Sequence, residues 1–329
     1  MVKFLIIRFS SIGDIVLTTP LIRCLKLQIE NAEIHYLTKA KYANILEANP
    51  YIDKIHTLDN DFQILIHELK SESFDYIIDL HKNIRTLRVK FALHKYSISF
   101  NKINLVKWLL VNFKINRLPK KHIVDRYFET LNSFPVINDQ KGLDFFIPKR
   151  DEINLREFFQ DKMGQYLLIV VGGGHFTKQI PTDKIVALIN NLNSIVVLIG
   201  GPEDCPKALE IEKHSEKKPI NLTGKLSVNQ SASLINQSEL ILTPDTGMMH
   251  IASAFKKKIF SVWGNTIPEF GMYPYLPGKG SKIFEVKDLK CRPCSKIGFK
   301  KCPKGHFYCM IKQNYNDLTE ELNNSLSGQ

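Results

Sequence analysis

Residues suited to acid–base chemistry stand near the start of the chain, directly after an apolar run at residues 2–7. Ser10, Ser11, Gly13 and Asp14 form a turn that leads into a helical pattern. Gly13 permits backbone angles closed to other residues, and free amides at a helix start hold an anion or orient a hydroxyl. Asp14 offers a carboxylate that suits a general base, the alternative being a helix cap. We predict that Asp14 is catalytic and that Ser10, Ser11 and Gly13 bind an acceptor.

A second candidate segment is a glycine-rich loop that follows the buried run at residues 167–171. It contains Gly173, Gly174, Thr177 and Lys178. Glycines let a phosphate approach the backbone, and a lysine neutralises a leaving diphosphate as its charge develops. The spacing is neither that of a Walker loop nor that of Gly-x-Gly-x-x-Gly, which weakens the NTPase and dehydrogenase interpretations. We predict that Gly173, Gly174 and Thr177 bind a phosphorylated donor and that Lys178 is catalytic.

The third candidate segment begins where an apolar run at residues 240–243 ends. Asp245 is expected to cap the next helix, whose small residues let its first turn approach a bound phosphate. The amides of Thr246 and Gly247 would hold a diphosphate, and His250, one turn further along, would hydrogen-bond a phosphate or a ribose. For this segment taken alone, the alternative is a capped helix with an incidental histidine.

Hydrophobic patterns predict an alternation of strands and helices that would position these segments. The expected strands lie at residues 2–7, 34–37, 76–80, 167–171, 195–199 and 240–243, and the expected helices at 15–27, 42–48 and 63–72. The first of these helices is expected to bend near Pro20. Such alternation indicates an α/β fold with parallel sheets covered by helices, in which ligands bind at the carboxyl ends of the strands.

The chain length indicates more than one domain, because 329 residues exceed what a single hydrophobic core usually serves. A polar stretch with a proline at residues 147–151 separates the two alternating patterns. We therefore expect one domain at residues 1–150 and a second at residues 151–329. Two such domains facing each other would leave a cleft between their loops.

The net charge of +12 is concentrated in one region. Between Lys82 and Arg126 the chain has twelve Lys or Arg residues and a single acid, Asp125. This concentration favours a partner-facing surface over a solvated face, and nucleic acid, an anionic membrane surface or a phosphorylated acceptor would fit it. Residues 101–117 mix basic side chains with apolar ones, including Trp108, which suits either an interfacial helix or one packed on its domain.

The apolar segments are too short for export or for membrane insertion. Arg8 interrupts the first apolar run well before the length of a signal peptide. The most apolar later stretch, residues 105–113, is far shorter than the roughly 20 residues of a membrane span. We expect a cytoplasmic protein.

Four of the six cysteines cluster near the C-terminus, namely Cys291, Cys294, Cys302 and Cys309. The Cys-x-x-Cys pair suits zinc, but the remaining spacings match no familiar zinc module. Structural disulfides would be unusual in a reducing compartment. Metal binding and metal-free reduced thiols both stay open, and the predicted site residues include no metal ligand.

Five segments, in this order, resemble glycosyltransferase family 9, the ADP-heptose:lipopolysaccharide heptosyltransferases. They are Ser10-Ser11-Ile12-Gly13-Asp14-Ile15-Val16-Leu17-Thr18-Thr19-Pro20, Lys178-x-x-Pro181, Gly200-Gly201-Pro202-Glu203, Asn221-Leu222-Thr223-Gly224 and Asp245-Thr246-Gly247-x-x-His250-x-Ala252. The resemblance covers almost the whole chain. It implies a GT-B fold, two Rossmann-like domains with a cleft between them, with the acceptor on the first and the nucleotide sugar on the second.

The resemblance also implies roles for individual residues. It matches Asp14 to the family's catalytic base, Lys178 to its phosphate-neutralising lysine, and residues 245–250 to its donor-binding motif. The implied reaction is an inverting, metal-independent transfer of a heptose or related sugar from an ADP-sugar, ADP-heptose above all, to a lipopolysaccharide core or similar lipid-linked acceptor. No cofactor is implied, and the enzyme would work in the cytoplasm, peripherally on the inner membrane. A Cys-rich segment near residues 291–309 is shared with the family and implies a structural role.

The chain departs from the family pattern around the catalytic lysine. Ile180 stands where Trp is common and Asp183 where Glu is common, and Gly173 and Gly174 replace hydroxyl residues. These departures leave the donor's sugar and base open.

Two other functions are to be weighed against the transferase. A nucleic-acid-binding protein would use the basic region and a zinc-like Cys cluster, but the sequence has no known recognition helix or aromatic RNA-binding motif to support it. A family member that binds nucleotide without catalysis is opposed by the presence of Asp14, Lys178 and His250.

Overall fold

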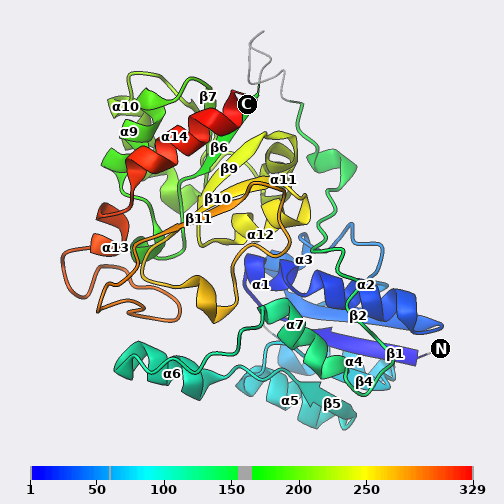
Figure 1. The fold of residues 1–329 in the computed structure, drawn as a ribbon. Coiled ribbons are helices and arrows are strands. Elements are labelled where there is room, and N and C mark those ends of the chain that lie inside the picture. The colour runs from blue at the N-terminus through cyan, green and yellow to red at the C-terminus, as the bar shows by residue number, and fades with distance from the viewer. Residues whose placement is uncertain (1, 59–60, 155–164, 328–329) are drawn as a thin grey trace. The chain divides into compact units, whose positions relative to one another are not determined.

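The computed structural model describes residues 2–58, 61–154 and 165–327. The chain divides into two compact units, Met1–Asn104 with Lys120–Pro148 and Leu105–Pro119 with Lys149–Gln329. Both units combine helices with strands (Figure 1). Residues 105–119 belong to the second unit although they lie within the first unit's span of sequence.

The first unit is built on a five-stranded parallel sheet of order β3-β2-β1-β4-β5. Its strands are β1 Val2–Ile7, β2 Ala32–Lys39, β3 Lys54–Leu58, β4 Tyr76–Asp79 and β5 Tyr96–Ser99. Its helices are α1 Ile12–Val16, α2 Thr19–Gln28, α3 Ala40–Ala43, α4 Phe62–Ser71, α5 Ile84–Leu93 and α7 Ile123–Phe128. Helices α4 and α5 share a core with one face of the sheet, and α2 packs with α7.

The second unit is built on a six-stranded parallel sheet of order β11-β10-β9-β6-β7-β8. Its strands are β6 Tyr166–Val170, β7 Ile195–Ile199, β8 Ile220–Asn221, β9 Leu240–Pro244, β10 Lys258–Trp263 and β11 Lys282–Glu285. Its helices are α9 Thr182–Asn191, α10 Cys205–His214, α11 Val228–Gln237, α12 Gly247–Ala254, α13 Tyr308–Ile311 and α14 Tyr315–Leu326. Helices α9, α10 and α14 share one core with the sheet, while α11 packs with α12 (Figure 1).

The predicted strands are confirmed, and the reason is burial. All five residues of β6 and of β9 are buried, as are the last four of β1. Strands of a parallel sheet are covered on both faces, so they appear in sequence as continuous apolar runs. The helix predicted at residues 63–72 is also confirmed, as α4.

Two helix predictions are wrong in their extent. The helix expected at residues 15–27 is two helices, because α1 ends at Val16 and α2 begins at Thr19. Pro20 lies in the first turn of α2, where its missing N–H costs nothing, so it starts a helix and does not bend one. The helix expected at residues 42–48 is the four-residue α3, followed by turns.

Helix α6, Asn104–Phe113, supports the interpretation of the basic segment at 101–117 as a helix packed on its unit, and the interfacial interpretation stays a prediction. Leu110 packs against Ile267 and Phe270 of the second unit, so one side of the helix is core. Trp108 and Phe113 remain exposed, with their ring centroids 5.2 Å apart.

Candidate functional site

The second unit has its candidate site where the strand order of its sheet reverses. Strand β6 is flanked by β7 on one side and by β9 on the other, although β9 comes two strands later in sequence than β7. In open α/β sheets ligands bind at this switch point, beyond the carboxyl ends of the strands. The loop that follows β6 carries Lys178, and Asp245 follows β9 directly. The fold therefore brings the second and third candidate segments to one place.

An ion pair joins these two segments. Lys178 Nζ lies 2.6 Å from Asp245 Oδ2, and both side chains are largely buried. Thr266 Oγ1 donates a second hydrogen bond to the same carboxylate oxygen at 2.9 Å. The prediction that Asp245 caps the next helix is wrong, because the N-cap residue is Thr246 and Asp245 lies before it. The carboxylate is engaged by Lys178 and Thr266 and so holds the lysine at the mouth of the sheet.

Helix α12 presents its first turn at the same end of the sheet. It begins at Gly247, and the first four amides of a helix have no partners within it. Thr246 Oγ1 lies 3.0 Å from Thr243 Oγ1, which fixes the hydroxyl before the helix start. His250 is buried one turn further along. A diphosphate placed here would meet amides, the positive end of the helix dipole and Lys178.

The loop after β6 divides into an open part and an anchored part. Gly174 has φ +40°, and a side chain placed there would meet nothing within 4 Å. A Cβ added at Gly173 would make only ordinary van der Waals contacts, since the nearest atom would be 3.5 Å away. Thr177 is buried, and its Oγ1 accepts from the Phe299 amide at 2.8 Å. The hydroxyl of Thr177 thus ties the residue next to Lys178 to the C-terminal segment.

The first unit also carries its candidate residue at a switch point, between β1 and β4. Asp14 lies in α1, directly beyond β1, and its Oδ1 forms an ion pair with Arg8 at 2.6 Å. The other oxygen accepts hydrogen bonds from the Ser11 amide at 3.0 Å and from Ser11 Oγ at 2.9 Å. Asp14 therefore makes a capping contact and presents a carboxylate, so the two interpretations of this residue are not exclusive.

The charge state of Asp14 follows from these contacts. Burial raises the pKa of the carboxyl, but the positive charge of Arg8 and the hydrogen bonds from Ser11 outweigh it, and the net pKa is lowered. Asp14 is consequently ionised at neutral pH. A proton acceptor must be ionised before it can act, and Asp14 meets that requirement.

The sequence analysis missed two residues near Asp14. One is Arg8, which forms the ion pair with Asp14, and the other is His81. Arg8 also donates to the Leu80 carbonyl at 2.5 Å, which links the ends of β1 and β4. His81 stacks at a tilt on Phe9, with ring centroids 5.1 Å apart. Burial and then the charge of Arg8 lower its pKa to about 4, so the imidazole is neutral at neutral pH. Both residues directly follow buried strands, which is the signal that would have found them.

The basic region contributes to a hollow in the first unit. A cavity of about 610 Å³ is lined by the apolar Leu58 and Phe62 and by four cationic side chains, Lys39, Lys41, Arg85 and Arg88. The Arg88 guanidinium lies 4.2 Å from the centre of the Phe62 ring. Since Arg85 and Arg88 fall within the basic stretch at 82–126, the charge concentration was a usable signal. Lys39, at the end of β2, and Lys41, in α3, were not singled out.

The clustered cysteines are reduced and influence one another. All six cysteines of the chain are free. Burial first, and then the neighbouring thiols, raise the pKa of Cys294 to about 11 and that of Cys309 to about 12. Among the described residues, these thiols do not bring three ligand atoms within 4.8 Å of one another. Metal binding and metal-free reduced thiols therefore both stay open at this cluster.

Within the described ranges, no helix has both the length and the apolar character needed to cross a bilayer.

Two parallel sheets in Rossmann order, each with polar residues beyond its switch point, define an α/β protein with two Rossmann-like units. A family model described as glycosyltransferase family 9 (heptosyltransferase) matches residues 63–302. That is well over half of the sequence, and the chain belongs to this family. It is a glycosyltransferase.

Individual relatives agree with this assignment. The chain is 25% identical over 294 residues to lipopolysaccharide heptosyltransferase 1 of Campylobacter coli, an alignment that covers 80% of this chain and 84% of the relative. The crystal structure of a family 9 glycosyl transferase from Veillonella parvula superposes with a TM-score of 0.82 at 22% identity, covering 99% and 98% of the two chains. E. coli heptosyltransferase WaaC with ADP-2-deoxy-2-fluoro heptose superposes with a TM-score of 0.67 at 16% identity, covering 97% and 98%. These structures confirm the GT-B fold.

Proposed function

We propose that this glycosyltransferase transfers a heptose or a closely related sugar from an ADP-sugar to a lipopolysaccharide core or a similar lipid-linked acceptor. The proposed binding of an ADP-sugar rests on the ion pair between Lys178 and Asp245. This pair lies beside the first turn of α12, at the point where the strand order of the sheet reverses. The names of the relatives support the sugar and the acceptor, and the WaaC complex supports an ADP donor.

The donor's diphosphate would lie on the second unit. The amides of Thr246 and Gly247 and the dipole of α12 would hold the phosphates, and His250 would contact a phosphate or the ribose. Lys178 would face the oxygen that becomes negative when the sugar leaves. Because Asp245 fixes the lysine in advance, no reorganisation is needed as that charge develops. Gly173 and Gly174 would let the phosphates approach the loop backbone.

Asp14 would accept the proton of the attacking hydroxyl. The acceptor oxygen forms a bond to the anomeric carbon, the bond from that carbon to the diphosphate breaks, and the configuration inverts. A carboxylate with a lowered pKa is a weak base, so it takes the proton only once the new bond has made the hydroxyl acidic. Ser10, Ser11 and Gly13 would position the acceptor next to it.

The acceptor would bind on the first unit. Its cationic hollow, lined by Lys39, Lys41, Arg85 and Arg88, fits phosphate groups on a lipid-linked glycan. The exposed Trp108 and Phe113 of α6 would contact an anionic membrane surface peripherally from the cytoplasm. We propose residues 1–150 as the acceptor-binding domain and 151–329 as the donor-binding domain, with residues 105–119 packed in the second unit.

The donor half is tested by isothermal titration of ADP. We expect Lys178→Ala to weaken ADP binding by roughly 1.5–3 kcal/mol, which is the usual value of a charged hydrogen bond. Lys213→Ala, which removes an exposed charge from α10 of the same unit, is the matched control and should bind like the parent. Equal affinities for the parent and Lys178→Ala would exclude the phosphate contact.

The proposed role of Asp14 as the base is tested by measuring turnover. Asp14→Asn keeps the shape of the side chain and removes the base, so we expect kcat to fall about 10²- to 10⁴-fold while ADP affinity stays unchanged. The control is Glu30→Gln at an exposed position of the same unit, which should keep full activity. An Asp14→Asn enzyme with the parent's kcat would show that another group takes the proton.

A further inference from the structure

Two buried histidines face each other on neighbouring strands of the first unit. His35 lies in β2 and His56 in β3, and both are 1% exposed. His35 Nδ1 is 2.9 Å from His56 Nε2. The ring of Phe74 meets His35 edge to face, with centroids 5.1 Å apart. None of these residues belongs to the proposed transferase machinery.

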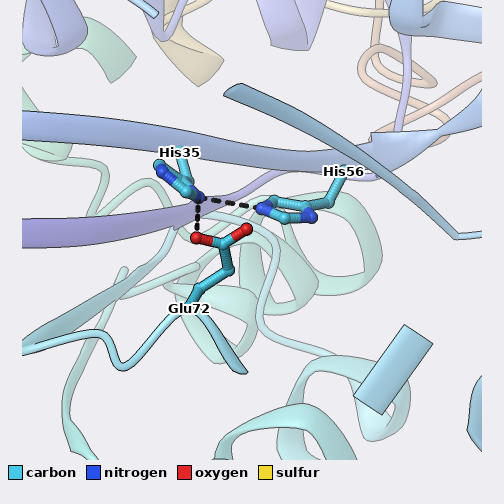
Figure 2. Close-up of side chains that lie close together, drawn as sticks. All are labelled: His35, His56 and Glu72. Carbon is cyan, nitrogen blue, oxygen red and sulfur yellow. Dashed lines mark hydrogen bonds and ion pairs between the residues drawn. The ribbon is translucent and has the colours of Figure 1, made fainter. Parts of the chain in front are cut away.

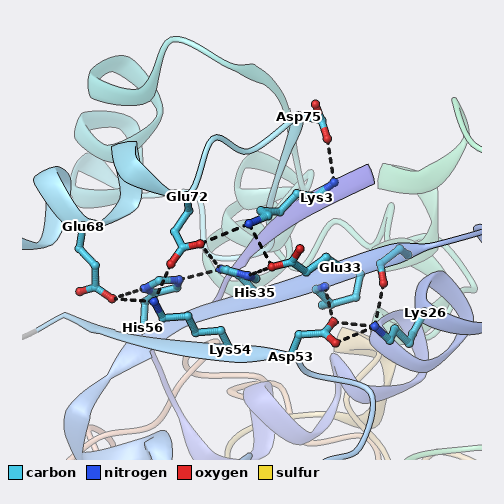
Figure 3. A network of polar contacts seen from close by, with 12 residues as sticks. Lys3, Lys26, Glu33, His35, Asp53, Lys54, His56, Glu68, Glu72 and Asp75 are labelled. Carbon is cyan, nitrogen blue, oxygen red and sulfur yellow. Dashed lines mark hydrogen bonds and ion pairs between the residues drawn. The ribbon is translucent and has the colours of Figure 1, made fainter. Parts of the chain in front are cut away.

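The outer nitrogen of each ring is hydrogen-bonded to a carboxylate. His35 Nε2 lies 2.7 Å from Glu33, and His56 Nδ1 lies 2.7 Å from Glu68 (Figure 3). An ionised carboxylate only accepts hydrogen bonds, so both outer nitrogens must carry the ring protons. When both rings are neutral, the two inner nitrogens therefore point bare lone pairs at each other. This arrangement is unfavourable unless a cation lies between them.

A third ligand atom stands beside the pair. Glu72, the residue that ends α4, has its Oε2 3.9 Å from His35 Nδ1. The three ligand atoms of His35, His56 and Glu72 all lie within 4.8 Å of one another (Figure 2). Among the described residues this is the only such group of three.

The charges around the cluster favour a bound cation. Lys54 Nζ is 2.5 Å from Glu72 Oε1, and Lys3 Nζ is 3.3 Å from Glu72 Oε2 (Figure 3). The cluster thus contains three carboxylates, those of Glu33, Glu68 and Glu72, and two ammonium groups, which leaves one negative charge in excess. A cation shared by the two histidines and Glu72 would offset it.

We propose that His35, His56 and Glu72 bind a divalent transition-metal ion of the zinc class. Metal–nitrogen bonds of about 2.0–2.1 Å place neighbouring ligands of a tetrahedral ion about 3.4 Å apart. The inner nitrogens, now 2.9 Å apart, would open by about 0.5 Å, and Glu72, now 3.9 Å from His35 Nδ1, would close on that nitrogen by about as much. The carboxylates of Glu33 and Glu68 already orient the rings as outer partners of metal-bound histidines do. The ion would join β2, β3 and the end of α4.

Co²⁺ titration of the full chain, without donor or acceptor, tests this proposal independently of the transferase activity. Co²⁺ bound to nitrogen and oxygen gives visible absorption, whereas Co²⁺ on cysteine adds an intense near-ultraviolet thiolate band, so the two kinds of site are distinguishable. We expect a Co²⁺ site without a thiolate band in the parent. His67→Gln should retain it, since it removes an exposed histidine of α4 near the cluster. His35→Gln and His56→Gln should lose it.

A milder variant covers the case in which the buried substitutions prevent folding. Glu68 is partly exposed and touches the metal only through His56, so Glu68→Gln should fold and should weaken Co²⁺ binding about 10- to 100-fold. A parent protein that shows Co²⁺ only on thiolates would overturn the proposal, and the pair would then share a proton alone. Unchanged Co²⁺ affinity in Glu68→Gln would overturn it equally.

Discussion

At the scale of single residues, the proposed chemistry depends on ion pairs that fix charged groups in advance. Arg8 holds Asp14 ionised, and Asp245 holds Lys178 at the mouth of its sheet. Each pair is largely buried, where removal of one partner leaves the other charge uncompensated. Arg8 therefore helps to set the charge of Asp14, and Asp245 sets the position of Lys178.

The pH dependence of turnover should report the Arg8–Asp14 pair. Asp14 must be ionised to accept a proton, so activity is lost as the pH falls through its pKa. Arg8 lowers that pKa, and burial alone would raise it. We expect Arg8→Gln to move the acid limb of the kcat profile to higher pH, measured as turnover against pH. Arg8→Lys keeps the charge and should leave the limb nearer its original position. An acid limb unmoved in Arg8→Gln would show that another group titrates there.

At the scale of elements, close packing holds the loops that follow the strands. Gly172 comes just after β6, and a Cβ added there would lie 1.8 Å from Asp204 Oδ2. Asp204 in turn accepts a hydrogen bond from the Gly201 amide at 2.9 Å, beyond the end of β7. The absence of a side chain at Gly172 thus lets the start of α10 pack against the loop that leads to Lys178.

Gly172→Ala should destabilise the second unit. The added methyl group must displace Asp204, and overpacking of this kind typically costs about 1–3 kcal/mol. We expect a Tm lowered by several degrees in a thermal melt. Gly173→Ala is the control, because its Cβ would make contacts no closer than 3.5 Å. Equal melting temperatures for Gly172→Ala and the parent would mean that Asp204 moves without cost.

At the scale of the whole molecule, each unit repeats one design. Both sheets are parallel and doubly wound, and each places its candidate residues beyond the strands at its switch point, β1 with β4 and β6 with β9. Asp14, the proposed base, and Lys178, the proposed leaving-group lysine, are therefore carried by separate units. A donor that binds only the folded second unit should stabilise it in proportion to affinity.

A thermal-shift panel of nucleotide sugars would identify the donor. At a concentration of one hundred times Kd, a ligand adds about 2.7 kcal/mol to the free energy of unfolding. We expect ADP-sugars, ADP-heptose foremost, to raise Tm more than UDP- or GDP-sugars, and Lys178→Ala to reduce that shift. A larger shift with a UDP-sugar would mean that the departures at Ile180 and Asp183 mark a different donor base.

The sequence by itself determined six of the strands, namely β1, β2, β4, β6, β7 and β9, and the three candidate segments that follow β1, β6 and β9. Buried parallel strands appear as apolar runs, and glycine, hydroxyl and charged residues directly after them mark loops at the carboxyl ends. The positions of Asp14, Lys178 and residues 245–250 follow from this local pattern, and so does the α/β class.

Only the tertiary structure decided which side chains meet. Lys178 and Asp245 are 67 residues apart in sequence, and His35 and His56 are 21 apart. Their contacts depend on strand order and register, which hydrophobic periodicity does not encode. For the same reason Asp245 was assigned to a helix cap, its nearest local role, while the structure gives it Lys178. Local patterns are set by neighbours in the chain, whereas ion pairs are set by neighbours in the sheet.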